Sequence, residues 1–289
     1  MRGAKLDIDW TRHTSPQGSR LTKFRLFLQE KGIRDSTIEN YSGNVERYLA
    51  FVHTDHPSPE DYMRFRESLH AWKLSRSTLN QYAYAARAYH EMIGTPIVVK
   101  RLDPKNQIPY YFSDDDVESI FSVITNIKHL AMLSTLFYGC LRASELCGLD
   151  DEDLDLDHQS IRVDGKGGKE AMVCINSICA NVLREYLAIR PPRLVEGRQP
   201  LFYTDYGQRW KRTDLHYVLR TYKKKAGVEK RGGLHVFARH TPATLMIANG
   251  CDIRIVQEVL RHDDIRTTLR YAHVSDKTKR TSYEKYLVL

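Results

Sequence analysis

Residues 160–175 have the sequence Ser-Ile-Arg-Val-Asp-Gly-Lys-Gly-Gly-Lys-Glu-Ala-Met-Val-Cys-Ile. Apolar and polar side chains alternate on both sides of a centre that holds Gly165, Gly167 and Gly168. Alternation has the period of a β-strand, and glycine supplies the backbone freedom of a tight turn. The stretch therefore predicts a β-hairpin with Lys166 at its tip.

Helical patterns lie on both sides of this hairpin. Upstream, Ser113 and Asp116 fit the cap of a helix whose apolar residues, from Val117 to Ile124, are spaced by three and four. Downstream, Asp252 is placed to cap a helix over residues 253–260. We therefore expect a domain over residues 112–289 that is mainly α with a small β-sheet, an α+β fold.

The first 94 residues have helical period throughout. Apolar residues spaced by three and four predict four amphipathic helices, one of which starts at Ser58 before Pro59. Ser36 and Glu39 have the spacing of a capping box for another. Four such helices predict a small helical bundle over residues 1–94. Residues 95–111 hold three prolines and lack helical period, so they are expected to form a linker.

The composition limits the partners and the compartment. The chain has 289 residues and a formal net charge of +8, which favours nucleic acid as a partner. No apolar run is long enough to cross a bilayer, and the N-terminal residues lack a signal core, so we expect a cytoplasmic protein. Five scattered cysteines without a C-x-x-C pair indicate neither a disulfide framework nor a zinc site.

Five residues stand out because of their order along the chain. Arg142, Lys166, Arg239, His262 and Tyr271 each have an ordinary structural explanation when taken alone, such as a helix-end arginine, a turn lysine or a packed tyrosine. Each of them also lies inside a distinctive local phrase, and the phrases follow one another in a fixed order. The ordered set is much more specific than any one of its members.

These phrases resemble those of the tyrosine recombinase (phage integrase) family, and the chain looks Xer-like. The similar phrases are Leu141-Arg142-Ala143-Ser144-Glu145-Leu146, Gly165-Lys166-Gly167-Gly168-Lys169-Glu170, Arg239-His240-Thr241-Pro242-Ala243-Thr244, Leu260-Arg261-His262, and Thr267-Thr268-Leu269-Arg270-Tyr271-Ala272-His273-Val274. The N-terminal phrases Ser36-Thr37-Ile38 and Ser77-Thr78-Leu79-Asn80 resemble the family's helical core-binding domain. The resemblance covers nearly the whole chain and implies a C-terminal catalytic domain.

The resemblance implies a site-specific recombinase that works through a 3′-phosphotyrosine. Two arginines offer planar, permanently charged donors to a phosphodiester, and they are expected to lower the pKa of the tyrosine. Lys166 would protonate the leaving 5′ oxygen. No metal, ATP or other cofactor is expected. The implied catalytic residues are Arg142, Lys166, His235, Arg239, His262 and Tyr271.

The sequence departs from the family pattern at three places. The second arginine box usually has the spacing His-x-x-Arg, whereas His235 and Arg239 are one residue further apart. Spacings of three and four share a helix face, so His235 can still reach the site, or Val236 can take its place. Arg261 replaces a common glycine. Pro242 is tolerated if it falls in the first turn of a helix.

Basic residues near the second arginine box are expected to follow the phosphates of double-stranded DNA. The residues assigned to DNA binding are Arg209, Lys211, Arg212, Lys223, Lys224, Lys225 and Arg261. The resemblance further implies a homo-oligomer on DNA, a tetramer in which the tail after Tyr271 docks on a neighbouring protomer. Without DNA the protein can still be a monomer.

Two other classes fit parts of the pattern. A type IB topoisomerase uses a similar tyrosine and set of cations, and a DNA-binding homologue impaired in catalysis would keep the fold. The complete set of five residues argues against an impaired homologue. The sequence does not specify the DNA target, nor does it separate chromosome-dimer resolution from integration of a mobile element.

Overall fold

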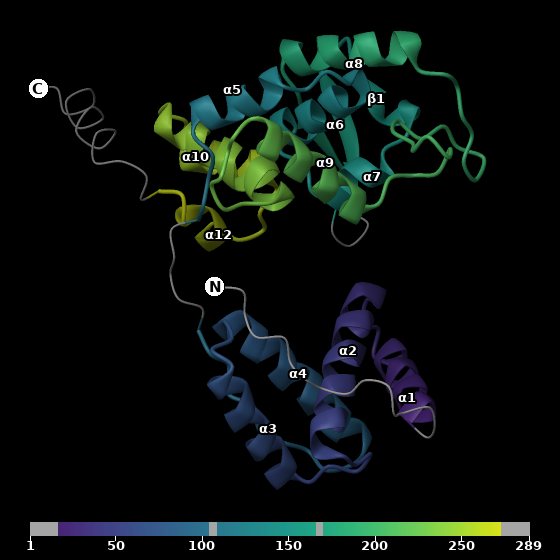
Figure 1. Ribbon diagram of the computed structural model, residues 1–289, viewed down its shortest axis with the longest axis vertical. Helices are drawn as coiled ribbons and strands as arrows, with labels where there is room; N and C mark the ends of the chain where they lie inside the picture. Colours follow the sequence, from purple (N-terminus) through teal and green to yellow (C-terminus); the bar gives the residue numbers. More distant parts are fainter. Residues whose placement is uncertain (1–16, 104–108, 166–169, 273–289) are drawn as a thin grey trace, which may run out of the picture. The chain divides into compact units, whose positions relative to one another are not determined.

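The computed structural model describes residues 17–103, 109–165 and 170–272 (Figure 1). The chain divides into two compact units, Met1–Asn106 and Gln107–Leu289. The division falls inside the segment 95–111, which we predicted as a linker. No helix in the described parts of the chain is both long and apolar enough to cross a membrane.

Four α-helices make up the described part of the first unit. They are α1 (Gln17–Glu30), α2 (Asp35–Val52), α3 (Pro59–Ala71) and α4 (Arg76–Met92). Their shared core is rich in aromatic side chains, among them Phe24, Tyr48, Phe65 and Tyr89. His90 is completely buried, and its ring nitrogens lie 2.8 Å from the hydroxyl of Tyr48 and 3.0 Å from the carbonyl oxygen of Thr95. Buried polar groups need such partners, so this network is part of the core.

The predicted helix starts have mixed outcomes. Ser58 caps α3 in a capping box with Asp61, as expected. The capping box predicted at Ser36 and Glu39 is wrong, because the N-cap of α2 is Arg34, two residues before Ser36, and Arg34 makes no side-chain cap. The carboxylate of Asp35 in the first turn faces the positive end of the helix, which stabilises the start without a cap.

The second unit combines helices with one small sheet. Its helical elements are α5 (Asp114–Ser122), α6 (Ile127–Tyr138), α7 (Ala143–Gly148), the 3₁₀-helix η1 (Asp151–Asp153), α8 (Ser177–Ile189), α9 (Arg212–Lys225), the π-helix η2 (Val236–His240), α10 (Thr241–Ala248), α11 (Ile253–Leu260) and α12 (Arg266–Leu269). Ser113 caps α5 in a box with Asp116, and Asp252 caps α11, as predicted.

The sheet has three antiparallel strands in the order β1 (Leu154–Asp155), β2 (Ser160–Asp164) and β3 (Glu170–Cys174). Strands β2 and β3 pair in register from Ser160 opposite Cys174 to Asp164 opposite Glu170. This pairing confirms the predicted hairpin and the mainly α fold with a small sheet. Its tip, which includes Lys166, lies outside the described residues.

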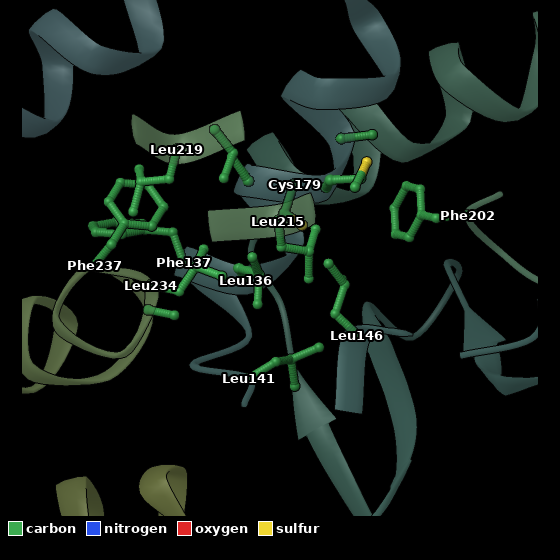
Figure 2. Packing of buried hydrophobic residues seen from close by; sticks show 14 of the residues in the cluster. Leu136, Phe137, Leu141, Leu146, Cys179, Phe202, Leu215, Leu219, Leu234 and Phe237 are labelled. Atoms are coloured by element: carbon green, nitrogen blue, oxygen red, sulfur yellow. The ribbon is translucent and has the colours of Figure 1, made fainter. Parts of the chain in front are cut away.

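One hydrophobic core holds the second unit together. Figure 2 shows buried side chains from helices, strands and loops that meet in this cluster. The labelled members include Leu136 and Phe137 from α6, Leu146 from α7, Leu215 from α9 and Phe237 from η2. Each fully buried side chain of this size stabilises the fold by about 1.5–3 kcal/mol. The core therefore fixes the ends of α6, α7 and η2, where the candidate site lies.

Gly232 occupies a backbone position that a side chain disturbs. Its φ is +149°, and an added Cβ would lie 2.9 Å from the ring of Phe112 and 2.9 Å from Val236. We expect Gly232→Ala to destabilise the second unit by about 1–3 kcal/mol, the usual scale of such backbone strain. The measurement is thermal melting. Gly233→Ala is the control, because its Cβ would meet only His216 at 3.3 Å. Equal melting temperatures for the two variants would contradict the expectation.

Candidate active site

Arg142 lies where α6 gives way to α7, as the N-cap residue of α7. The carboxylate of Glu145 accepts from the Arg142 backbone N–H at 2.7 Å and from its Nη1 at 2.6 Å. Glu145 is buried, whereas the Arg142 side chain is 35% exposed. The guanidinium is thus held on one side by the carboxylate and is accessible to a ligand on another.

Arg239 is buried in η2 and ties two distant segments together. Its Nη1 donates to the carbonyl oxygen of Cys140 at 2.7 Å, and its Nη2 donates to that of Leu260. Its Nε is buried without a partner. Burial lowers the pKa of Arg239 to about 10, with further lowering by the charges of Arg142 and Arg261. The Arg239 guanidinium remains a cation at neutral pH and interacts with the charge of Arg142.

The π-helix η2 explains the unusual spacing of the second arginine box. The backbone N–H of Thr241 donates to the carbonyl oxygen of Val236, five residues back instead of four. Pro242, in the first turn of α10, has no N–H to donate. The wide turn takes up the extra residue between His235 and Arg239. Val236 packs against the hydrophobic core, and His235 is exposed.

His235 lies close enough to the arginines of the site to be affected by their charges. Its ring lies 4.7 Å from the ring of His240, centroid to centroid. Partial desolvation lowers the pKa of His235, and the charges of Arg239, Arg142 and Arg270 lower it further. The structure therefore brings His235, and not Val236, toward the arginines.

His262 follows the C-terminal end of α11. Its Nδ1 lies 2.9 Å from the hydroxyl oxygen of Thr268. The pKa of His262 is lowered to about 4, mainly by burial and to a smaller extent by the charges of Arg239 and Arg142. His262 is therefore neutral at pH 7 in the protein without DNA, and its remaining ring nitrogen is free to bond a phosphate oxygen.

Arg261 sits at the end of α11 in the left-handed conformation, with φ 51° and ψ 51°. Such a backbone suits glycine best, which explains why a glycine is common there. Here the Arg261 Nη2 donates to Glu145 at 2.6 Å, so a single carboxylate binds both Arg261 and Arg142. The Nε and Nη1 of Arg261 are buried without partners.

Tyr271 follows α12 and is only 2% exposed. It packs in a small cluster with Cys140, Ala243, Val256 and Leu260. Its hydroxyl lies 2.6 Å from Nδ1 of His240. Burial raises the pKa of Tyr271, while the charges of Arg270 and Arg239 lower it less strongly. The expectation of a lowered pKa is therefore wrong for the protein without DNA, because desolvation outweighs the arginines.

Sequence reasoning missed two members of this site, Glu145 and His240. Glu145 is three residues after Arg142, a spacing that places the carboxylate on the same helical face as the arginine. His240 directly follows Arg239 in a phrase that the family resemblance had already singled out. The contact between His240 and Tyr271 depends on the wide turn of η2. In the sequence this turn is visible only as the extra residue between His235 and Arg239.

The predicted DNA-binding residues differ in how free their charges are. Lys211, Arg212, Lys224 and Lys225 are exposed at the start and the end of α9. Three others already bind within the protein: Arg209 pairs with Asp150, Lys223 donates to the carbonyl oxygens of Lys230 and Gly232, and Arg261 pairs with Glu145. Lys166 lies outside the described residues, so the structure does not place it.

The geometry defines a class of protein. A pair of arginines, neutral histidines and a tyrosine with its hydroxyl in a hydrogen bond form one connected site, and a site of this kind suits transfer of a phosphodiester to the tyrosine. Residues 111–278 match the Phage integrase family, and residues 21–93 match the Phage integrase, N-terminal SAM-like domain. The chain belongs to the phage integrase family and is a tyrosine recombinase, an enzyme that cleaves and rejoins DNA in site-specific recombination.

Curated relatives match along nearly their whole length. Tyrosine recombinase XerA of Thermococcus kodakarensis is 32% identical over 275 residues, which cover 92% of this chain and 94% of the relative. Tyrosine recombinase XerD of Oceanobacillus iheyensis is 28% identical over 287 residues, which cover 91% and 96%. These matches favour a recombinase over a topoisomerase.

Solved structures share the fold. The crystal structure of XerA recombinase matches with a TM-score of 0.56 and 26% identity, and covers 95% of this chain and 100% of that one. The XerH site-specific recombinase bound to its difH substrate, in a pre-cleavage complex, matches with a TM-score of 0.70 and 19% identity over 94% and 84% of the two chains.

Proposed function

We propose that this protein recombines duplex DNA through a 3′-phosphotyrosine at Tyr271. Arg142, Arg239 and His262 interact electrostatically with one another, and Arg239 also acts on Tyr271; this arrangement carries the proposal. The phenolic oxygen attacks the phosphorus, the bond to the 5′ oxygen breaks, and the new ester conserves the energy of the broken linkage. Attack by a 5′ hydroxyl of a partner strand reverses the step and joins new ends.

The cations stabilise the charge that grows on the phosphate. Arg142 presents donors that Glu145 does not use, and His262 and His235 can each donate from a ring nitrogen. Arg239 holds the segments around Cys140 and Leu260 in place and adds its charge. Donors fixed before substrate arrives need little rearrangement, so they favour the transition state more than water does. Because Tyr271 is buried, DNA binding must uncover it.

The exposed basic residues of α9 are proposed to bind DNA phosphates. In the described part of the chain, no salt bridge joins Lys211, Arg212, Lys224 or Lys225 to a carboxylate that would compete with a phosphate. Arg209, Lys223 and Arg261 are less suited, because each already holds part of the fold. We place the protein in the cytoplasm, where it has access to chromosomal DNA.

Lys166 is proposed as the general acid that protonates the leaving 5′ oxygen. We expect Lys166→Ala to cleave an ordinary substrate about 10²–10⁴-fold more slowly, the usual contribution of general acid catalysis. A 5′-bridging phosphorothiolate, whose thiolate leaves without a proton, should restore most of the rate. The measurement is single-turnover cleavage on both substrates. Equal defects on the two would remove Lys166 from this role.

The tail after Tyr271 is proposed to join protomers in a tetramer on two DNA sites. Residues 273–289 lie outside the described residues. Tyr286 and Leu287 follow Tyr283 by three and four positions, which favours one apolar face of a short helix, and such a helix needs a surface to pack against. We expect deletion of residues 282–289 to leave thermal melting and single-site binding nearly unchanged while synapsis of two sites is lost. Native gels with one-site and two-site substrates measure this. A large fall in melting temperature with loss of single-site binding would instead assign the tail to its own domain.

A further inference from the structure

In the described part of the chain, the side chain that hydrogen-bonds the Tyr271 hydroxyl is His240. The Nδ1 of His240 lies 2.6 Å from that hydroxyl, within hydrogen-bond distance. The tyrosine is 2% exposed, so water has little access to its proton. Because this contact exists before DNA binds, His240 is already placed to receive the proton when the oxygen attacks phosphorus.

We propose that His240 is a catalytic residue that accepts the Tyr271 proton as the phenolic oxygen attacks the phosphodiester. The proton passes from Oη to Nδ1, the bond from Oη to phosphorus forms, and the bond from phosphorus to the 5′ oxygen breaks. When a 5′ hydroxyl later attacks the phosphotyrosine, His240 returns the proton to Tyr271. His235 and His262 are then left to bind the phosphate oxygens.

The charges around His240 connect this transfer to DNA binding. The charged and titratable groups that face His240 are His235 and Arg239 on its own helix, His262 beyond α11, and Arg270 and Tyr271 beyond α12. Burial and then the two arginines and two other histidines of this set lower the pKa of His240 to about 4, while burial raises that of Tyr271. Without DNA the proton therefore stays on the tyrosine. A phosphodiester bound by the arginines adds negative charge, which raises the proton affinity of His240.

The wide turn of η2 places His240 in this role. His240 is the last residue of η2, and its ring contacts both the ring of His235 and the ring of Tyr271, at 4.7 Å and 5.6 Å between centroids. It directly follows Arg239, so the group that receives the proton and a cation of the phosphate site share one rigid turn.

The test replaces the base and changes the acidity of the nucleophile. His240→Asn keeps a hydrogen-bonding amide near Nδ1 but cannot take the proton. We expect single-turnover cleavage to fall about 10²-fold or more at pH 7, within the usual range for a general base. Its rate should rise with pH as phenolate forms, whereas the parent should level off once His240 is neutral. A fluorinated tyrosine at position 271, which is more acidic, should restore much of the lost rate.

A second tyrosine–histidine pair supplies the matched control. The Nδ1 of His129 lies 3.0 Å from the hydroxyl of Tyr222, and the ring of His129 contacts those of Trp210 and Tyr222, outside the candidate catalytic residues. His129→Asn should therefore cleave like the parent. If His240→Asn melts well below the parent, His240→Gln takes its place in the same measurements.

The outcomes separate the possible failures. Parent-like or faster cleavage by the His240 variants would mean that His240 only restrains Tyr271, and the inference would be overturned. A slow variant that the fluorinated tyrosine does not rescue would also overturn it. The inference rests on Tyr271 as the nucleophile. An adduct mapped to another tyrosine removes the proposed function as well, whereas an adduct on Tyr271 with an unaffected variant removes only the role of His240.

Discussion

Tyr271→Phe is expected to abolish the covalent protein–DNA adduct and leave DNA binding intact. The change removes the attacking oxygen and keeps the ring that packs against Cys140 and Leu260. The lost hydrogen bond to His240 should lower the free energy of unfolding by only about 0.5–1.5 kcal/mol. Denaturing gels of reactions with suicide substrates measure the adduct, and mobility shifts measure binding.

Tyr222→Phe is the matched control for this change. Its hydroxyl also lies against a histidine Nδ1, and its ring is also buried. It should lose a similar amount of stability and form the adduct at the parental rate. An adduct that persists in Tyr271→Phe and maps to Tyr286 would contradict the assignment of the nucleophile.

Arg239→Lys is expected to slow cleavage by about 10²–10³-fold, the usual effect of losing one fixed donor to the transition state. A lysine ammonium has no planar fork with which to reach the carbonyl oxygens of Cys140 and Leu260 together. A buried carbonyl left without a donor costs about 1–3 kcal/mol, so the melting temperature should fall as well. Cleavage is therefore measured well below that temperature.

Arg190→Lys separates the loss of stability from the loss of catalysis. The Arg190 side chain is only 5% exposed, and its Nη1 donates to the carbonyl oxygens of Pro200 and Leu201 at 2.8 Å and 3.0 Å. It also pairs with Asp151, outside the candidate site. This variant should lose stability to a similar degree and cleave at the parental rate. If both variants cleaved equally slowly, the role of Arg239 would be structural only.

Much of the fold could be predicted because its signals are local. The alternation in residues 160–175 defines β2 and β3, and Ser58, Ser113 and Asp252 each cap a helix where the sequence places them. Side-chain period and cap chemistry act within a few residues, so a single sequence carries them. The start of α2 was misplaced by two residues, because a first-turn acid there replaces a side-chain cap.

The site was less predictable, because its contacts join distant parts of the chain. The order of the motifs pointed to Arg142, Arg239, His262 and Tyr271, but not to the burial that reverses the expected pKa shift of the tyrosine. Arg261 was expected near DNA, a prediction that stays untested, and in the protein without DNA its side chain donates to Glu145, 116 positions away in sequence. Desolvation and long-range ion pairs depend on tertiary packing, which local patterns do not encode.

The π-turn at Val236–His240 bears on how the gene could have changed. An added codon inside an α-helix normally rotates every later side chain by about 100°, because an α-helix has about 3.6 residues per turn. A widened turn confines that rotation to one place and leaves the rest of the helix in its former orientation. We therefore expect that gain or loss of one residue between His235 and Arg239 leaves the packing of Ala243 against Tyr271 in place. A chain with one residue fewer between His235 and Arg239 is therefore expected to keep the downstream helix in the same orientation.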